Sequence, residues 1–153
     1  MDIRTGHVCL LAYAFLYYME SESRLLIMAL GANIDAHRNL SLAQERLRTH
    51  WQDIRFTQPV CTAPVGVATA SFLNCLAVAS VTDDYPAIHT MLKEIEMAMG
   101  STTEDHHCGI VLIDIDVLQL GSDRYHLSDW NRPYMRGLLH QLEAELHVKP
   151  SMP

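Results

Sequence analysis

Four stretches of the chain carry apolar residues in runs or in partial alternation, a pattern typical of β-strands. They cover residues 25–30, 53–61, 72–81 and 109–120. The first stretch ends in Gly31-Ala32-Asn33, which indicates a turn. Pro59 lies inside the second, and because proline cannot donate to a strand ladder, this strand is expected at a sheet edge or at a bulge. Residues 62–70 are expected to form a loop.

Three other stretches repeat apolar residues at the spacing of an amphipathic helix, and they cover residues 38–51, 85–99 and roughly 131–147. Asp35 is expected to cap the first helix, and Gly100 to end the second. Residues 101–109 are polar and predict a loop. The apolar positions of the three helices are Leu40, Ala43, Leu47 and Trp51, then Ile88, Leu92, Ile95 and Met99, and finally Leu138, Leu139, Leu142 and Leu146.

The predicted order is β-α-β-β-α-β followed by a terminal helix. This order is typical of an α+β ferredoxin-like sandwich, in which helices pack on one face of a four-stranded antiparallel sheet, with a C-terminal helix added here. No repeat, linker or low-complexity stretch indicates a second domain. Residues 25–150 are therefore expected to form a single domain, and residues 1–24 an N-terminal extension.

The extension contains an apolar run of twelve residues, 8–19. This run is too short to cross a bilayer, which takes about 20 residues. Arg4 precedes it, but no clean small-residue cleavage site follows, so we expect a protein that is not secreted. In the alternative interpretation Met19 is the true start and the first eighteen residues are not native.

Composition and charge narrow the possible partners. The chain has 153 residues, of which 49% are hydrophobic and 19% charged, an ordinary globular balance. A formal net charge of −7 argues against a nucleic-acid-binding surface. The four cysteines form no CxxC pair, so reduced thiols and a cytoplasmic location are expected. His106-His107-Cys108 is interpreted as a polar loop and not as a zinc site. The sequence permits a monomer or a dimer.

Asp114 and Asp116 lie two residues apart in the last predicted strand. Their side chains therefore share one face, roughly 7 Å apart along the backbone. Two like charges on one strand face repel each other, and a hard cation would offset that cost, because carboxylate oxygens suit Mg²⁺. The alternative is a solvated strand face with two ordinary surface carboxylates.

Several motifs, in order and at nearly the expected spacing, resemble those of the 6-hydroxymethyl-7,8-dihydropterin pyrophosphokinase family. The resemblance covers about residues 25–142, and no single motif in it is specific. The matching segments are Gly31–Asn33, Asn39–Leu47, Thr62–Gly66, Phe72–Asn74, Ile95–Gly100 and Ile113–Asp116.

The resemblance implies transfer of pyrophosphate from MgATP to the hydroxymethyl group of a reduced pterin, in folate biosynthesis. It implies two Mg²⁺ ions held by Asp114 and Asp116, which would be the catalytic and metal-binding residues. ATP and the pterin would be the small-molecule partners, with no nucleic acid and no membrane. The implied pterin-binding residues are Thr62, Val65, Phe72 and Asn74, and the implied nucleotide-binding residues are Glu96, Trp130, Arg132 and Arg136.

The chain departs from the family pattern in the segment before the Asp strand. Ser101 and Val111 stand where the family has arginines, and Cys108 where it has a tryptophan. The segment is net acidic, the wrong sign for holding phosphates. Three possibilities stay open: an active kinase that uses Mg²⁺, Arg132 and Arg136, a paralogue that binds pterin without turnover, and a ferredoxin-like interaction module.

Overall fold

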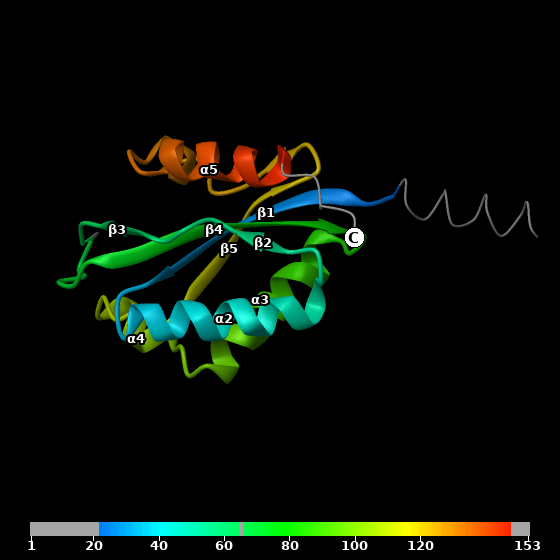
Figure 1. Ribbon diagram of the computed structural model, residues 1–153. Helices are drawn as coiled ribbons and strands as arrows, with labels where there is room; N and C mark the ends of the chain where they lie inside the picture. Colours follow the sequence, from blue (N-terminus) through cyan, green and yellow to red (C-terminus); the bar gives the residue numbers. More distant parts are fainter. Residues whose placement is uncertain (1–21, 65, 148–153) are drawn as a thin grey trace, which may run out of the picture.

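The computed structural model describes residues 22–64 and 66–147 (Figure 1). Within these residues six strands form one antiparallel sheet in the order β2-β4-β1-β5-β6, with β3 also paired to β4. The strands are β1 (Arg24–Ala32), β2 (Arg55–Phe56), β3 (Val60–Thr62), β4 (Phe72–Val81), β5 (Asp114–Leu120) and β6 (Asp123–Arg124). The helices are α2 (Ala36–His50), α3 (Tyr85–Ala98), α4 (Thr103–His107) and α5 (Met135–His147), with a short 3-10 turn at Asp129–Asn131.

Helices cover both faces of the sheet (Figure 1). The apolar stripes predicted for α2 and α3 pack in a first core on one face. On the opposite face α5 buries Met135, Leu138 and Leu142 in a second, smaller core. The central strand β1 contributes to both, since Leu26 and Met28 face the first core while Ile27 faces the second. Two buried faces explain why β1 is apolar at successive positions.

The α+β class and the antiparallel sheet are confirmed, but the prediction of four strands is wrong, because the sheet has six. The segment around Pro59 splits into β2 and β3, which pair with different parts of β4. Thr57 lies between them and bonds Leu76 in both directions, its backbone N–H donating at 2.9 Å and its hydroxyl accepting at 2.9 Å. The sixth strand, β6, forms a hairpin with β5 through the turn at Gly121, where φ is +60°. The detailed ferredoxin-like topology stays a prediction.

The segment before β5 also differs from its prediction. Residues 103–107 form the short helix α4 where a loop was predicted, because the Thr102 hydroxyl caps it by accepting from the Asp105 N–H at 3.1 Å. The strand predicted over 109–120 begins only at Asp114. The preceding residues are held by Asn33, whose side chain accepts from the Val111 N–H at 2.7 Å and donates to the Gly109 carbonyl at 2.7 Å.

Asp35 is the N-cap residue of α2, as predicted, and its carbonyl accepts from the Asn39 N–H at 2.9 Å, but its backbone is left-handed, with φ of 40°, and its side chain makes no capping hydrogen bond. One prediction about the last helix is wrong. Leu146 was expected on the apolar face of α5, yet it is 46% exposed, because the second core does not extend to the last turn. Gly100 ends α3 as predicted, with φ of +93°.

No helix in residues 22–64 and 66–147 is long and apolar enough to cross a bilayer. Cys61, Cys75 and Cys108 are free thiols, as predicted. Cys9, the apolar run 8–19 and Val65 lie outside the described residues.

Candidate active site

Strand register places the acidic pair and the predicted pterin residues in one row across the sheet. Asp114 lies opposite Gly31 of β1, and Gly31 lies opposite Asn74 of β4. One step further along, Asp116 lies opposite Ala29. Because side chains alternate along a strand, Asp114, Asp116 and Asn74 point to the same face. The residues between them on β5 face the first core, where Ile115 is 1% exposed.

This face of the sheet is only partly covered by α5. The helix packs over Leu118 and leaves the row with Asp114 and Asn74 open. A cavity of about 250 Å³ lies there. Its lining residues are Ala29, Leu30, Gly31, Thr62, Phe72, Asn74, Val111, Asp114, Asp116, Asp129, Arg132 and Tyr134.

The β3–β4 end of the cavity is built around Asn74. Its amide Nδ2 donates to the Thr62 hydroxyl at 2.6 Å, which holds the side chain in one orientation. The position across from it on β1 is Gly31, where a Cβ would lie 2.9 Å from the Asn74 Oδ1. Any other residue there would force the amide to shift. Phe72 and Tyr134 add aromatic rings to the lining.

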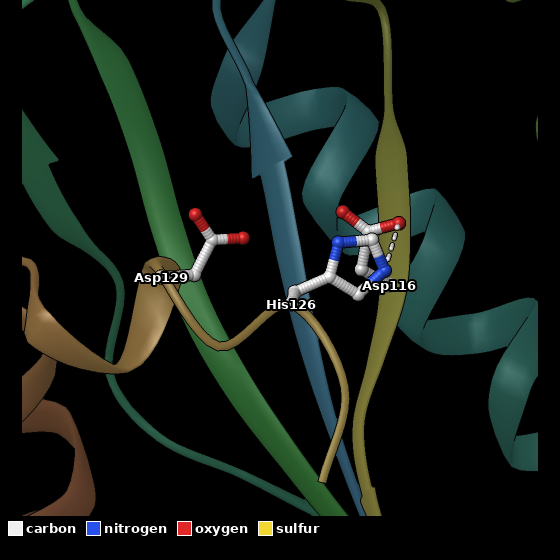
Figure 2. A group of neighbouring side chains, drawn as sticks. All are labelled: Asp116, His126 and Asp129. Carbon is white, nitrogen blue, oxygen red and sulfur yellow. Dashed lines mark ion pairs between the residues drawn. The ribbon is translucent and has the colours of Figure 1, made fainter.

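Asp116 is part of a group of three possible metal ligands (Figure 2). One ligand atom each from Asp116, His126 and Asp129 lie within 4.8 Å of one another. His126 Nε2 is 3.6 Å from Asp116 Oδ1, and Asp129 accepts from Arg132 Nε at 2.8 Å. Figure 2 shows His126 and Asp129 on the connection that follows β6, with the His126 ring beside the Asp116 carboxylate and Asp129 further along, in front of the neighbouring strands.

Asp114 has a different neighbour, an ion pair on α3. Lys93 Nζ donates to both oxygens of Glu96, at 2.9 and 3.0 Å, and lies 3.8 Å from Asp114 Oδ1. Glu96 is buried and also accepts from the Ile115 N–H at 2.6 Å. Glu96 therefore anchors the β5 backbone between the two aspartates, and Lys93 balances its charge.

The site carries an excess of negative charge. Its carboxylates are Asp114, Asp116, Asp129 and Glu96, and its permanent cations are Lys93 and Arg132. Burial and then the charge of Asp114 raise the pKa of Asp116 from 3.8 to about 6, and His126 and Lys93 only partly oppose this. The carboxylate pair is thus incompletely neutralised by its own protein neighbours, which suits binding of a cation.

The model of the 7,8-dihydro-6-hydroxymethylpterin-pyrophosphokinase (HPPK) family matches residues 27–145. The match covers β1 from Ile27 onward, the other five strands of the sheet and the whole cavity lining. The chain belongs to the HPPK family. A search of curated proteins found no match.

The HPPK cavity brings together most of the predicted site residues, though not all of them. Thr62, Phe72, Asn74, Asp114, Asp116 and Arg132 line it. Trp130 packs against the second core, with its indole N–H donating to the Tyr125 carbonyl at 3.1 Å and Arg124 stacked 4.2 Å above its ring. Arg136 lines a separate hollow on α5. Glu96 is buried behind β5 and engaged with Lys93 and Ile115, outside the cavity lining.

Sequence reasoning did not single out four residues that line this cavity or contact its aspartates. They are Lys93, His126, Asp129 and Tyr134. Lys93 carried a local signal, since it lies three residues before Glu96 on one helix, a spacing that brings two side chains together. Asp129 and Tyr134 flank Arg132 closely in sequence. His126 carried no such signal, because its place depends on the turn after β6.

The segment that lacks the family's arginines does not line the HPPK cavity, except for Val111 at its end. The Ser101 hydroxyl donates to the Ile113 carbonyl at 3.0 Å and lies 3.0 Å from His106 Nε2. These contacts tie α4 to the start of β5. Ser101 and His106 therefore support the segment structurally.

Proposed function

We propose that this protein transfers the pyrophosphoryl group of MgATP to 6-hydroxymethyl-7,8-dihydropterin. The observation that carries this proposal is the row Asp114–Gly31–Asn74, which places a carboxylate pair and an aromatic, amide-lined pocket in one cavity. Family membership supports the same reaction class. We expect the reaction to take place in the cytoplasm.

The Asn74 end of the cavity suits a flat, hydrogen-bonding ring. The Asn74 Oδ1 is left as an acceptor, since Nδ2 is engaged by Thr62. Phe72 and Tyr134 offer rings against which a pterin can stack. Burial raises the pKa of Tyr134, so this residue stays a neutral phenol at physiological pH. We propose that Thr62, Phe72, Asn74 and Tyr134 hold the pterin, with Val65 as a further predicted contact.

The other end of the cavity suits magnesium, since carboxylate oxygens are hard ligands. Asp114 and Asp116 supply them, and Asp129 is close enough to Asp116 to take part. When bound, Mg²⁺ would neutralise charge on the transferred phosphates. Arg132 is the cation of the lining and can meet a phosphate if it exchanges its Asp129 partner. Glu96, Trp130 and Arg136 stay predicted nucleotide contacts.

In the proposed reaction the pterin hydroxyl oxygen forms a bond to the β-phosphorus of ATP. The bond from that phosphorus to the α–β bridging oxygen breaks, AMP leaves, and the hydroxyl proton is lost. The protein's contribution is position: Asn74 and the two rings orient the pterin, while the aspartates fix the phosphate end.

The direct test is to incubate the protein with MgATP and the reduced pterin and to measure, by chromatography, the AMP that is released. We expect stoichiometric AMP and pterin pyrophosphate, with neither product when EDTA is present. ADP as the product would contradict pyrophosphoryl transfer. Absence of all products, with both ligands bound, would favour the alternative below.

Gly31→Ala is expected to weaken pterin binding roughly tenfold, which corresponds to the loss of about one hydrogen bond. The added Cβ would lie 2.9 Å from the Asn74 Oδ1 and displace the amide from Thr62. Pterin affinity can be measured by the change in ligand fluorescence. Gly137→Ala is the matched control, because a Cβ there meets nothing within 4 Å. Wild-type affinity in Gly31→Ala would exclude the proposed role of Asn74.

One observation favours the alternative that the protein binds pterin without turnover. Arg132 is the cation that lines the cavity, and it is already paired with Asp129. Calorimetry separates the two functions. Binding of pterin together with a magnesium–ATP analogue supports the kinase, and pterin binding alone supports the alternative. If neither ligand binds, the remaining alternative is that the protein is a ferredoxin-like interaction module.

A further inference from the structure

Lys93 is the second permanent cation of the site, and it reaches the carboxylates from outside the cavity. On its outer edge β5 pairs with β6 only at Gln119 and Leu120, so the strand is open at Asp114 and Asp116. Helix α3 lies along this edge, and Glu96 takes up the free N–H of Ile115. Lys93 lies one turn earlier on the helix, with its ammonium beside Asp114.

The hydrogen bonds of Lys93 leave it with a free donor. An ammonium group has three N–H donors. Two of them meet Glu96, and the 3.8 Å distance to Asp114 is too long for a hydrogen bond. The side chain is 37% exposed, so solvent or a ligand can reach it. Lys93 is thus held in place by Glu96 while a third contact remains available.

The ammonium also keeps its charge in this position. A lysine ammonium is protonated at neutral pH, and here Glu96 accepts from two of its N–H donors and so stabilises the charged form. A fixed cation next to metal-binding carboxylates is placed where a nucleotide's phosphates would lie.

We propose that Lys93 binds a phosphate oxygen of the nucleotide and supplies positive charge that residues 101–110 do not. Before the nucleotide binds, Lys93 acts as a partial counter-ion of Asp114. With magnesium bound at Asp114, that carboxylate would attract the ammonium less, and the free N–H could donate to the phosphate while Glu96 keeps the ammonium at the edge of β5. This proposal rests on the proposed function, since it needs a nucleotide at the Asp114 end of the site.

The test is calorimetric binding of an ATP analogue with a methylene group between the α- and β-phosphorus, at saturating Mg²⁺. Lys93→Gln is expected to weaken binding roughly 10- to 100-fold, the range for loss of one charge-assisted hydrogen bond. Lys93→Arg should stay within about threefold of the wild type, since it keeps a charged donor. Arg46→Gln, an exposed cation on α2, controls for net charge. Pterin binding alone should not change in any of the three.

A second variant excludes a merely structural role. If Lys93 served only to neutralise Glu96, Lys93→Gln would cost no affinity in a Glu96→Gln background, whatever Glu96→Gln costs by itself. We expect the double variant to bind the analogue roughly 10-fold or more weaker than Glu96→Gln alone. Equal affinity of the double variant and Glu96→Gln, or wild-type affinity in Lys93→Gln, would overturn the role of Lys93 and leave the proposed function standing. A wild-type protein that does not bind the analogue would overturn both.

Discussion

Replacing either metal-binding aspartate, as Asp114→Asn or Asp116→Asn, is expected to lower turnover by more than ~100-fold. Both carboxylates line the cavity from adjacent rows of one sheet face. An amide keeps the size of the side chain but loses the charge that would bind magnesium. The measurement is the rate of AMP release at saturating MgATP and reduced pterin.

A control variant separates the effect of losing a carboxylate in the cavity from the effect of changing the protein's net charge. Asp123→Asn removes one carboxylate from an exposed position of β6 and should keep wild-type activity. Pterin binding without nucleotide should persist in both active-site variants, because Asn74 and Phe72 are unchanged. Turnover within tenfold of the wild type in either aspartate variant would remove the metal-binding argument.

The second prediction is that Asp116→Asn makes the metal-free protein more stable at neutral pH. Its carboxyl ionises near 3.8 in the unfolded chain but at about 6 in the folded protein, chiefly because of burial and of the Asp114 charge. Between these values the folded state binds more protons, so wild-type stability falls as pH rises from about 4 to about 6. The amide has no charge to desolvate. We expect a gain of about 3 kcal/mol above pH 7, from a pKa shift of this size.

The gain should depend on pH in a defined way. In EDTA, urea unfolding should show a higher free energy of unfolding for the variant than for the wild type at pH 8. Most of this difference should be gone at pH 4, where the carboxyl is protonated in the folded state and only about half ionised in the unfolded chain. Asp123→Asn should track the wild type at both values. Equal free energies of unfolding for Asp116→Asn and the wild type at pH 8 would show that the ionised Asp116 carboxylate does not destabilise the folded protein. Together, the two predictions describe a residue that lowers stability in order to bind a cation.

Local patterns were sufficient for most of the secondary structure. Leu40, Ala43 and Leu47 repeat at helical spacing, and they bury one stripe of α2 as expected. The alternation around Asp114 and Asp116 correctly put both on one face, because the period of a strand depends only on its own backbone. Errors arose where a distant contact overrode the local pattern. Asn33 holds residues 109–111 out of the strand, and Thr57 separates β2 from β3.

The arrangement of the site residues could not be predicted from local patterns, because it depends on strand register and on packing. No local pattern shows that Asn74 and Asp114 share a row through Gly31, since the residues are far apart in sequence and are joined only by strand pairing. The same holds for His126 and Asp129, which a turn after β6 brings to Asp116. Lys93 reaches Asp114 because α3 lies along an open strand edge. Periodicity and motifs, which are short-range, were enough to indicate the elements and the acidic pair. The cavity, its charge balance and its cations arise from long-range contacts, which exist only once the sheet and helices have packed.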